Sequence, residues 1–139
     1  MKTTIAILFL CIFILQSCSS PKQVTNSKER LTDIWVLEKL GDLSVSRNDF
    51  SKEIPRLEIR LNENRFTGST GCNQMEGKIT ATGNKIKFEN IGTTKMMCEK
   101  NRDSEILQAL NSADNFVLEK MKLTIKCGDK VNAVFKKVD

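Results

Sequence analysis

Two cysteines lie where the sequence constrains the backbone most. Cys72 stands in residues 67–77, which place three glycines and Asn73 between two strand-like runs. Gly and Asn adopt positive φ at low cost, so this stretch predicts a tight turn rather than a flexible linker. Cys98 ends residues 93–98, which leave another strand-like run and lead into a helical pattern. On the residues alone, the two cysteines either bond to each other across the two bends or stay as buried free thiols in two surface loops.

The chain contains neither histidine nor tyrosine. This composition excludes Ser-His-Asp catalysis, Cys-His catalysis and any metal site built on imidazole. Cys72 or Cys98 could still act as a nucleophile, but a cysteine nucleophile needs a base or a cation beside it. Glu76 and Glu99 are the candidate bases and Lys95 is the candidate cation. Because no histidine is present to shuttle a proton, we predict no catalytic residues and no enzymatic activity.

The N-terminal residues have the form of an export signal. Lys2 precedes an apolar run over residues 5–15, which is too short to span a bilayer. The tetrapeptide Leu-Gln-Ser-Cys that ends at Cys18 resembles the bacterial lipobox, where the peptide is cleaved before the cysteine and the sulfur is lipidated. We predict a signal peptide over residues 1–17, lipidation of Cys18, and a polar tether over residues 18–30. The alternatives are an ordinary signal peptide or a short membrane anchor.

The sequence predicts no metal, cofactor or nucleic-acid site. Cys11 is lost with the signal peptide, so three unlipidated cysteines remain, one short of a tetrahedral sulfur site. No Asp-x-Asp-x-Asp-Gly run typical of calcium loops occurs. The formal net charge is +5, and both signs are scattered along the chain without interleaved aromatic residues. We therefore expect a solvated surface that binds neither a cofactor nor a nucleic acid.

Residues 31–139 predict a mainly β domain of the α+β class. Trp35 and Leu37 lie two positions apart and share one face of a first strand, whereas residues 42–53 have no clear pattern and predict a loop. Two hairpins and three C-terminal strands follow from alternating runs bounded by turn residues. Residues 101–111 have apolar side chains at helical spacing and predict an amphipathic helix. We expect an antiparallel meander or partly open barrel of about eight short strands, packed with this single helix.

These landmarks resemble the META domain (HslJ-like) family. The resemblance covers about residues 31–137 and rests mainly on a Gly-Cys-Asn motif followed by a Thr-x-Met-x-Cys motif. It implies a compact antiparallel β domain with one helix, often held in the cell envelope by a lipid anchor. Members have been linked with heat stress, antibiotic tolerance, motility and secretion, and no catalytic mechanism is established for them. The motif positions are Gly71, Cys72, Asn73, Gly77, Thr94, Met96 and Cys98.

The resemblance also bears on the cysteines. It makes Cys72 and Cys98 motif positions and implies a disulfide between them, in a compartment where close thiols oxidise. Cys127 is not part of the pattern and is expected to keep a reactive thiol. The rival arrangements are free buried thiols, or a bond from either motif cysteine to Cys127.

We interpret the chain as a lipid-anchored, non-enzymatic envelope protein, either a binding or a stress-response module. Ser19 favours the outer membrane, facing the periplasm, because Asp after the lipidated cysteine signals inner-membrane retention in many lipoproteins. The alternatives are a pilot-like or chaperone-like lipoprotein of a secretion or assembly system, or a carrier of a small apolar ligand. The expected partners are the membrane, through Cys18, and an envelope protein or apolar ligand, and we expect a monomer. For Met75, Met96 and Met97, which flank the two bends, we expect core filling.

Overall fold

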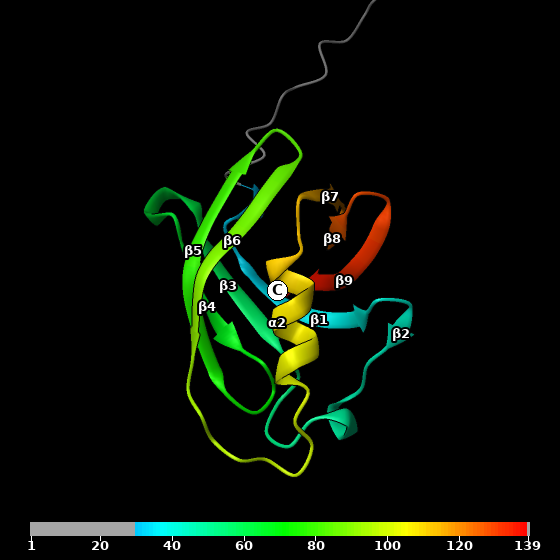
Figure 1. Ribbon diagram of the computed structural model, residues 1–139. Coiled ribbons are helices and arrows are strands. Elements are labelled where there is room, and N and C mark those ends of the chain that lie inside the picture. Colours follow the sequence, from blue (N-terminus) through cyan, green and yellow to red (C-terminus); the bar gives the residue numbers. More distant parts are fainter. Residues whose placement is uncertain (1–29, 139) are drawn as a thin grey trace, which may run out of the picture.

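The computed structural model of the chain describes residues 30–138 (Figure 1). Its strands, 3-10 helices and α-helix are, in chain order, β1 (Ile34–Leu40), β2 (Leu43–Ser44), η1 (Arg47–Asp49), β3 (Arg56–Arg60), η2 (Leu61–Glu63), β4 (Arg65–Ser69), β5 (Gln74–Thr82), β6 (Lys85–Thr93), α2 (Asp103–Asn111), β7 (Asn115–Glu119), β8 (Lys122–Cys127) and β9 (Lys130–Lys137).

The strands form one antiparallel sheet that curves partly into a ring. Their order is β2-β1-β3-β4-β5-β6-β7-β8-β9, and β1 also pairs with β9. The junction between β6 and β7 is the shortest, because it consists of one residue pair, Lys85 opposite Asn115. The ring is therefore open beside this junction and is not a barrel. The predicted α+β class and antiparallel arrangement are confirmed.

Helix α2 lies across the opening of the ring, where it contacts β6 and β9 (Figure 1). Ile106, Ala109 and Leu110 form its buried face, at the spacing that places side chains on one side of a helix. The helix begins at Asp103 rather than at residue 101. The side chain of Asn101 accepts the Asp103 N–H at 2.8 Å, which satisfies one of the free N–H groups of the first turn.

The segment 42–53 differs from the predicted loop, because it contains β2 and η1. Strand β2 pairs only with the end of β1 and both its residues are exposed, so no apolar alternation could reveal it. It is also the reason that the sheet has nine strands instead of about eight.

In η1, the Asp49 carboxylate accepts the Ser46 N–H at 2.6 Å. This bond is the main cause that lowers the pKa of Asp49 from its ordinary value.

Apolar side chains from every strand except β2 fill the interior of the ring. Trp35 is among the most deeply buried, and its indole N–H donates to Leu31 O at 3.0 Å. Phe66 and Phe88 meet edge to face with ring centroids 5.2 Å apart, a favourable aromatic geometry. Because the centre is packed in this way, functional groups are to be sought at the ends and on the outer face of the sheet.

Candidate functional site at one end of the sheet

The bend between β4 and β5 holds its shape through its own hydrogen bonds. The Thr70 N–H donates to Asn73 O, and the Asn73 N–H donates to Thr70 Oγ1, each at 2.9 Å. Gly71 adopts φ +91°, and a Cβ there would lie 2.6 Å from the ring of Phe50. Glycine is therefore required at this position both by backbone conformation and by space.

The side chain of Asn73 joins this bend to the segment that follows β6. Its Oδ1 accepts the Thr94 hydroxyl at 2.8 Å and the Met96 N–H at 2.7 Å. Its Nδ2 donates to Met96 O at 3.2 Å and to the Asp103 carboxylate at 2.6 Å. Asn73 is only 2% exposed. Since an amide can accept two hydrogen bonds and donate two, this buried side chain is fully satisfied.

Asp103, the first residue of α2, brings the helix to the same point. Its carboxylate accepts a hydrogen bond from the Thr70 hydroxyl as well as the one from Asn73. Sequence reasoning did not assign Asp103 this role. The one signal for it was an acidic residue at the start of a helix, where the helix dipole alone would explain it.

Cys72 and Cys98 form a disulfide with a Cα–Cα distance of 5.9 Å. The predicted pairing is confirmed, and the rival arrangements with free thiols or with Cys127 are wrong. The bond ties the bend to the approach of α2 beside the Asn73 hydrogen bonds. We call the resulting unit the clasp. Its members are Thr70, Cys72, Asn73, Thr94, Met96, Cys98 and Asp103.

A third segment, the loop that contains η1, packs against the clasp. Phe50 is buried beneath Gly71, and the Lys52 N–H donates to Gly71 O at 3.0 Å. The Lys100 N–H donates to Ser51 Oγ at 2.9 Å, which joins this loop to the segment between Cys98 and α2. Residues 42–53, in which the sequence shows no motif, thus contact the motif residues through this loop. The isolated aromatic Phe50 in a polar stretch was the available signal.

The methionines divide between core and surface. Met75 is 3% exposed, as expected for a core residue. Met96 is 43% exposed and Met97 is 100% exposed, so the expected core filling is wrong for these two. The physical reason is that Asn73 holds the backbone of Met96 while the disulfide holds Cys98, which leaves the side chain between them facing solvent.

Gly77, the remaining motif residue, lies in β5 outside the clasp. A Cβ at Gly77 would lie 2.7 Å from the ring of Phe66 and 2.8 Å from Glu89 O. Its role is therefore close packing of the sheet over an aromatic ring. The motif residues other than Gly71 and Gly77 are brought together in the clasp.

A groove of about 520 Å³ is lined by residues of β1 and of β3 to β6 and by Thr94 of the clasp. Its lining includes Ile34, Arg56, Glu58, Gln74 and Glu76.

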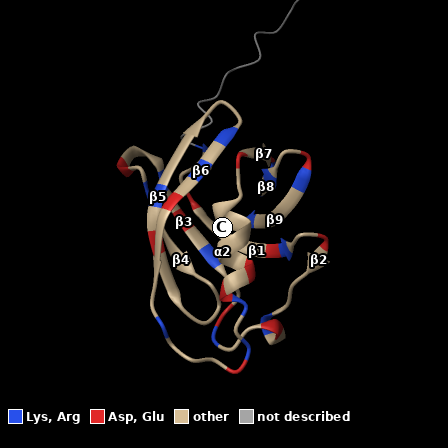
Figure 2. Ribbon diagram, viewed as in Figure 1, with Lys and Arg blue, Asp and Glu red and all other residues tan. Residues whose placement is uncertain are grey.

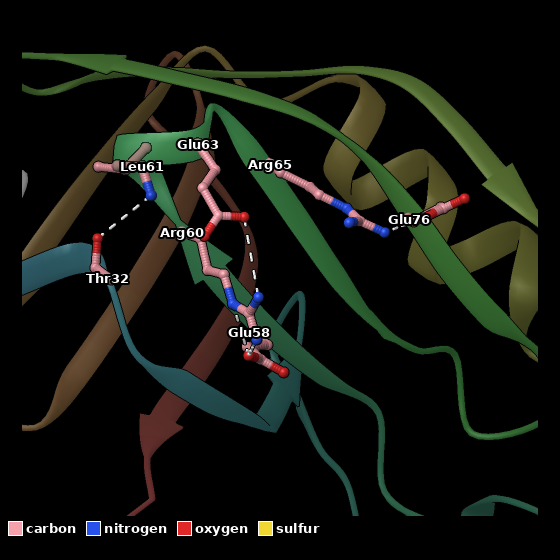
Figure 3. A network of polar contacts seen from close by, with 7 residues as sticks. All are labelled: Thr32, Glu58, Arg60, Leu61, Glu63, Arg65 and Glu76. Atoms are coloured by element: carbon pink, nitrogen blue, oxygen red, sulfur yellow. Dashed lines mark hydrogen bonds and ion pairs between the residues drawn. The ribbon is translucent and has the colours of Figure 1, made fainter.

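The carboxylates of this groove are held by arginines of neighbouring positions, as Figure 3 shows. Arg65 binds Glu76 at 2.6 Å across β4 and β5, and Arg60 binds Glu58 at 2.5 Å within β3. These pairs are substantially exposed to solvent, so each contributes little to stability. The charges of the groove are thus locally balanced.

The thiols and carboxylates considered for catalysis do not form a reactive group. Cys72 and Cys98 are bonded to each other, so neither carries a thiolate. Glu76 is paired with Arg65, and Glu99 is exposed. Cys127 is an exposed free thiol at the end of β8.

Within residues 30–138, no three or more His, Cys, Asp or Glu side chains gather as a metal site would require. In the same residues, helices are too short or too polar to cross a membrane. The predicted signal peptide, the lipidation site Cys18 and the tether up to residue 29 lie outside the described residues.

The fold and the clasp define a class of protein: a small antiparallel α+β domain closed by one helix and tied at one end by a disulfide. The META domain family model matches residues 29–139. The chain belongs to the META domain family, which confirms the resemblance found in the sequence. No curated protein matches it significantly.

Several solved structures share this fold. An NMR structure has a TM-score of 0.61 and 22% identity, covering 79% of this chain and 93% of its own. A second NMR structure, of a protein from Burkholderia xenovorans, has a TM-score of 0.61 and 23% identity, covering 81% and 87%. A crystal structure of a DUF4847 family protein from Bacteroides vulgatus has a TM-score of 0.55 and 19% identity, covering 78% and 95%. At these identities the likeness shows the fold alone.

Proposed function

We propose that this protein is a lipid-anchored, non-enzymatic binding protein of the cell envelope, a META domain held at the outer membrane and facing the periplasm. The observation that carries the proposal is that the motif residues other than Gly71 and Gly77 are bonded to one another in the clasp instead of being arranged around an open reactive group. Lys2, the apolar run and the tetrapeptide ending at Cys18 support the anchor, and Ser19 supports the outer membrane.

A surface contact with an envelope protein fits this architecture better than a ligand carried inside, because the interior of the ring is packed with side chains. Such a contact suits a pilot-like, chaperone-like or stress-response role. A second candidate, carriage of a small apolar ligand, draws support from the groove, where Ile34 offers exposed apolar surface. The domain acts as a monomer in either role.

The anchor is tested by mass spectrometry of the full chain expressed in a bacterium with an outer membrane. We expect a mature N-terminal peptide that begins at Cys18 and carries acyl chains, since stable anchoring takes more than one chain. The Cys18→Ala variant should leave the membrane fraction. An unmodified peptide that begins at another residue would refute the anchor.

The absence of enzymatic activity is tested with a panel of ester and peptide substrates. We expect no turnover that depends on the clasp. Turnover that disappears in Cys72→Ser or Cys98→Ser, with the circular dichroism spectrum unchanged, would show that the protein is an enzyme.

A further inference from the structure

We propose that the end of the domain formed by residues 46–53 and 94–102, here called the methionine tip, docks a protein that presents an apolar socket with an acidic rim. The inference rests on the proposed binding function and names the surface and the partner chemistry. In Figure 1 these two loops lie together at the end of the molecule opposite the β5–β6 hairpin. Hydrogen bonds between Lys100 and Ser51 join them.

The first support is an exposed apolar side chain on a rigid support. Met97 is 100% exposed, although a large apolar side chain gains free energy from leaving water. Its loop is held by Asn73 at Met96, by the disulfide at Cys98 and by Ser51 at Lys100. A loop that is ordered before binding loses less conformational entropy on docking. Methionine, with a flexible and polarisable side chain, adapts well to a socket.

The second support is the charge of the two loops that form the tip. The basic residues of the tip are Arg47, Lys52, Lys95, Lys100 and Arg102, and its three carboxylates are Asp49, Glu53 and Glu99. Asp49 accepts hydrogen bonds from Ser46, so its charge is partly engaged within its own turn.

Figure 2 shows basic and acidic residues on the two loops of the tip. Lys52 Nζ lies 3.1 Å from the sulfur of Met96, so a cation lies directly beside the residue that precedes Met97. The surface complementary to an apolar knob within a cationic collar is an apolar socket with an acidic rim.

The third support is the position of the tip relative to the chain entry. Strand β3 starts at Arg56, next to the loop of residues 46–53, and runs to Arg60. At its far end the Leu61 N–H donates to the hydroxyl of Thr32, near the first described residues (Figure 3). The chain therefore enters at the end away from the tip. A domain tethered there presents the tip away from the lipid anchor, which favours a protein over the membrane as the occupant, as does Glu99 among the tip residues.

The test uses the full lipidated chain in cells, with a photo-crosslinking amino acid in place of Met97. The matched control carries the same amino acid in place of Val117, which is 40% exposed and lies in β7. We expect a discrete protein adduct at position 97 that is absent at position 117. An adduct with lipid only, or equal adducts at both positions, overturns the proposal.

The charge of the socket is tested in the same crosslinking assay. Lys52→Glu combined with Lys95→Glu should lower the adduct yield at position 97 by about fivefold, the effect of losing roughly 1 kcal/mol of charge complementarity. Lys130→Glu combined with Lys136→Glu changes the net charge equally on exposed residues outside the tip and should leave the yield unchanged. An unchanged yield in the tip variant, or an equal loss in both variants, overturns the acidic rim.

Mass spectrometry of Cys18 in the same cells separates this inference from the proposed anchor. A position-specific adduct from an unlipidated chain refutes the anchor and supports the tip. A lipidated chain without such an adduct supports the anchor and refutes the tip.

Discussion

At the scale of the residue, Asn73 links more of the molecule than any other clasp side chain. One amide contacts the segment after β6 through two different residues and the start of α2 through a third. The contact with Asp103 spans 30 positions of sequence. A buried polar network of this kind stabilises a single arrangement, because any alternative leaves polar groups without partners.

Removal of the Asn73 amide should destabilise the domain strongly. In Asn73→Ala, the Met96 N–H loses its acceptor and the Asp103 carboxylate keeps only the hydrogen bond from Thr70 of its two side-chain bonds, and we expect the free energy of unfolding to fall by about 2–4 kcal/mol. Urea denaturation with the disulfide intact measures the change. Gln74→Ala, at the exposed neighbouring position, should change stability by less than about 0.5 kcal/mol. Similar losses in the two variants would contradict a special role for Asn73.

At the scale of the element, three segments far apart in sequence meet at one end of the sheet: the η1 loop, the β4–β5 bend and the approach to α2. Hydrogen bonds hold each of them to at least one other, in addition to the disulfide. The disulfide is therefore not the sole connection. Its loss should lower stability while leaving the arrangement of the strands intact.

The size of this loss follows from loop closure. The bond joins residues 26 positions apart, so the chain-entropy model gives about 3.5 kcal/mol for Cys72→Ser combined with Cys98→Ser. Urea denaturation measures the loss, and an unchanged far-ultraviolet circular dichroism spectrum shows that the fold remains. Cys127→Ser, which removes the exposed free thiol, is the control and should be neutral. If the double variant is unfolded in buffer, the hydrogen bonds alone do not hold the three segments together.

Low pH should weaken the hydrogen bond that Asp114, directly before β7, accepts from the Gly128 N–H in the β8–β9 turn. The N–H of Gly128, followed by the Asn115 amide, lowers the pKa of Asp114 below 3.8, its ordinary value. A carboxylate whose pKa is lower in the folded than in the unfolded state stabilises the fold above that ordinary value, and the contribution is lost as pH falls through the folded-state pKa.

We therefore expect Asp114→Ala to lower the thermal midpoint at neutral pH, and the difference from the wild type to shrink below pH 3.8. Asp129→Ala in the adjoining turn serves as the control, since Asp129 is exposed. A difference that stays constant with pH would mean that the Asp114 charge is not responsible.

At the scale of the whole molecule, the interior of the ring is packed with side chains. Functional groups are therefore expected at the ends and on the outer face of the sheet. Helix α2 covers the opening, and the clasp fixes the position at which this helix begins. The number of free thiols shows whether the clasp disulfide has formed. Cys72 and Cys98 are bonded and Cys127 is free, and in the lipidated form that we propose Cys18 would be a thioether.

Thiol counting on the mature, denatured protein tests this assignment. We expect one reactive thiol, on Cys127, before reduction and three after reduction. Peptide mapping with an alkylating reagent identifies them. Alkylation of Cys72 before reduction, or a peptide that links it to Cys127, would contradict the structure.

The sequence by itself determined the features that depend on local pattern. Alternation at Leu57 and Ile59 predicts a strand with one buried face, and the apolar positions of residues 101–111 predict the helix face that meets the sheet. Its motifs, by resemblance, predicted the disulfide and the family. These predictions succeed because strand and helix periods are expressed over a few consecutive residues.

Only the tertiary structure decided which distant groups meet. The partners of Asn73 depend on the register of β5 and β6, so nothing near Asn73 in sequence names Met96 or Asp103. Met97 faces solvent although its side chain is hydrophobic, because the backbone beside it is held at Met96 and at Cys98. In residues 42–53, order comes from the pairing of β2 with β1, from the Ser46–Asp49 hydrogen bonds at η1 and from contacts with the bend. Long-range hydrogen bonds and packing override the local pattern at these places, which together form the clasp and the methionine tip.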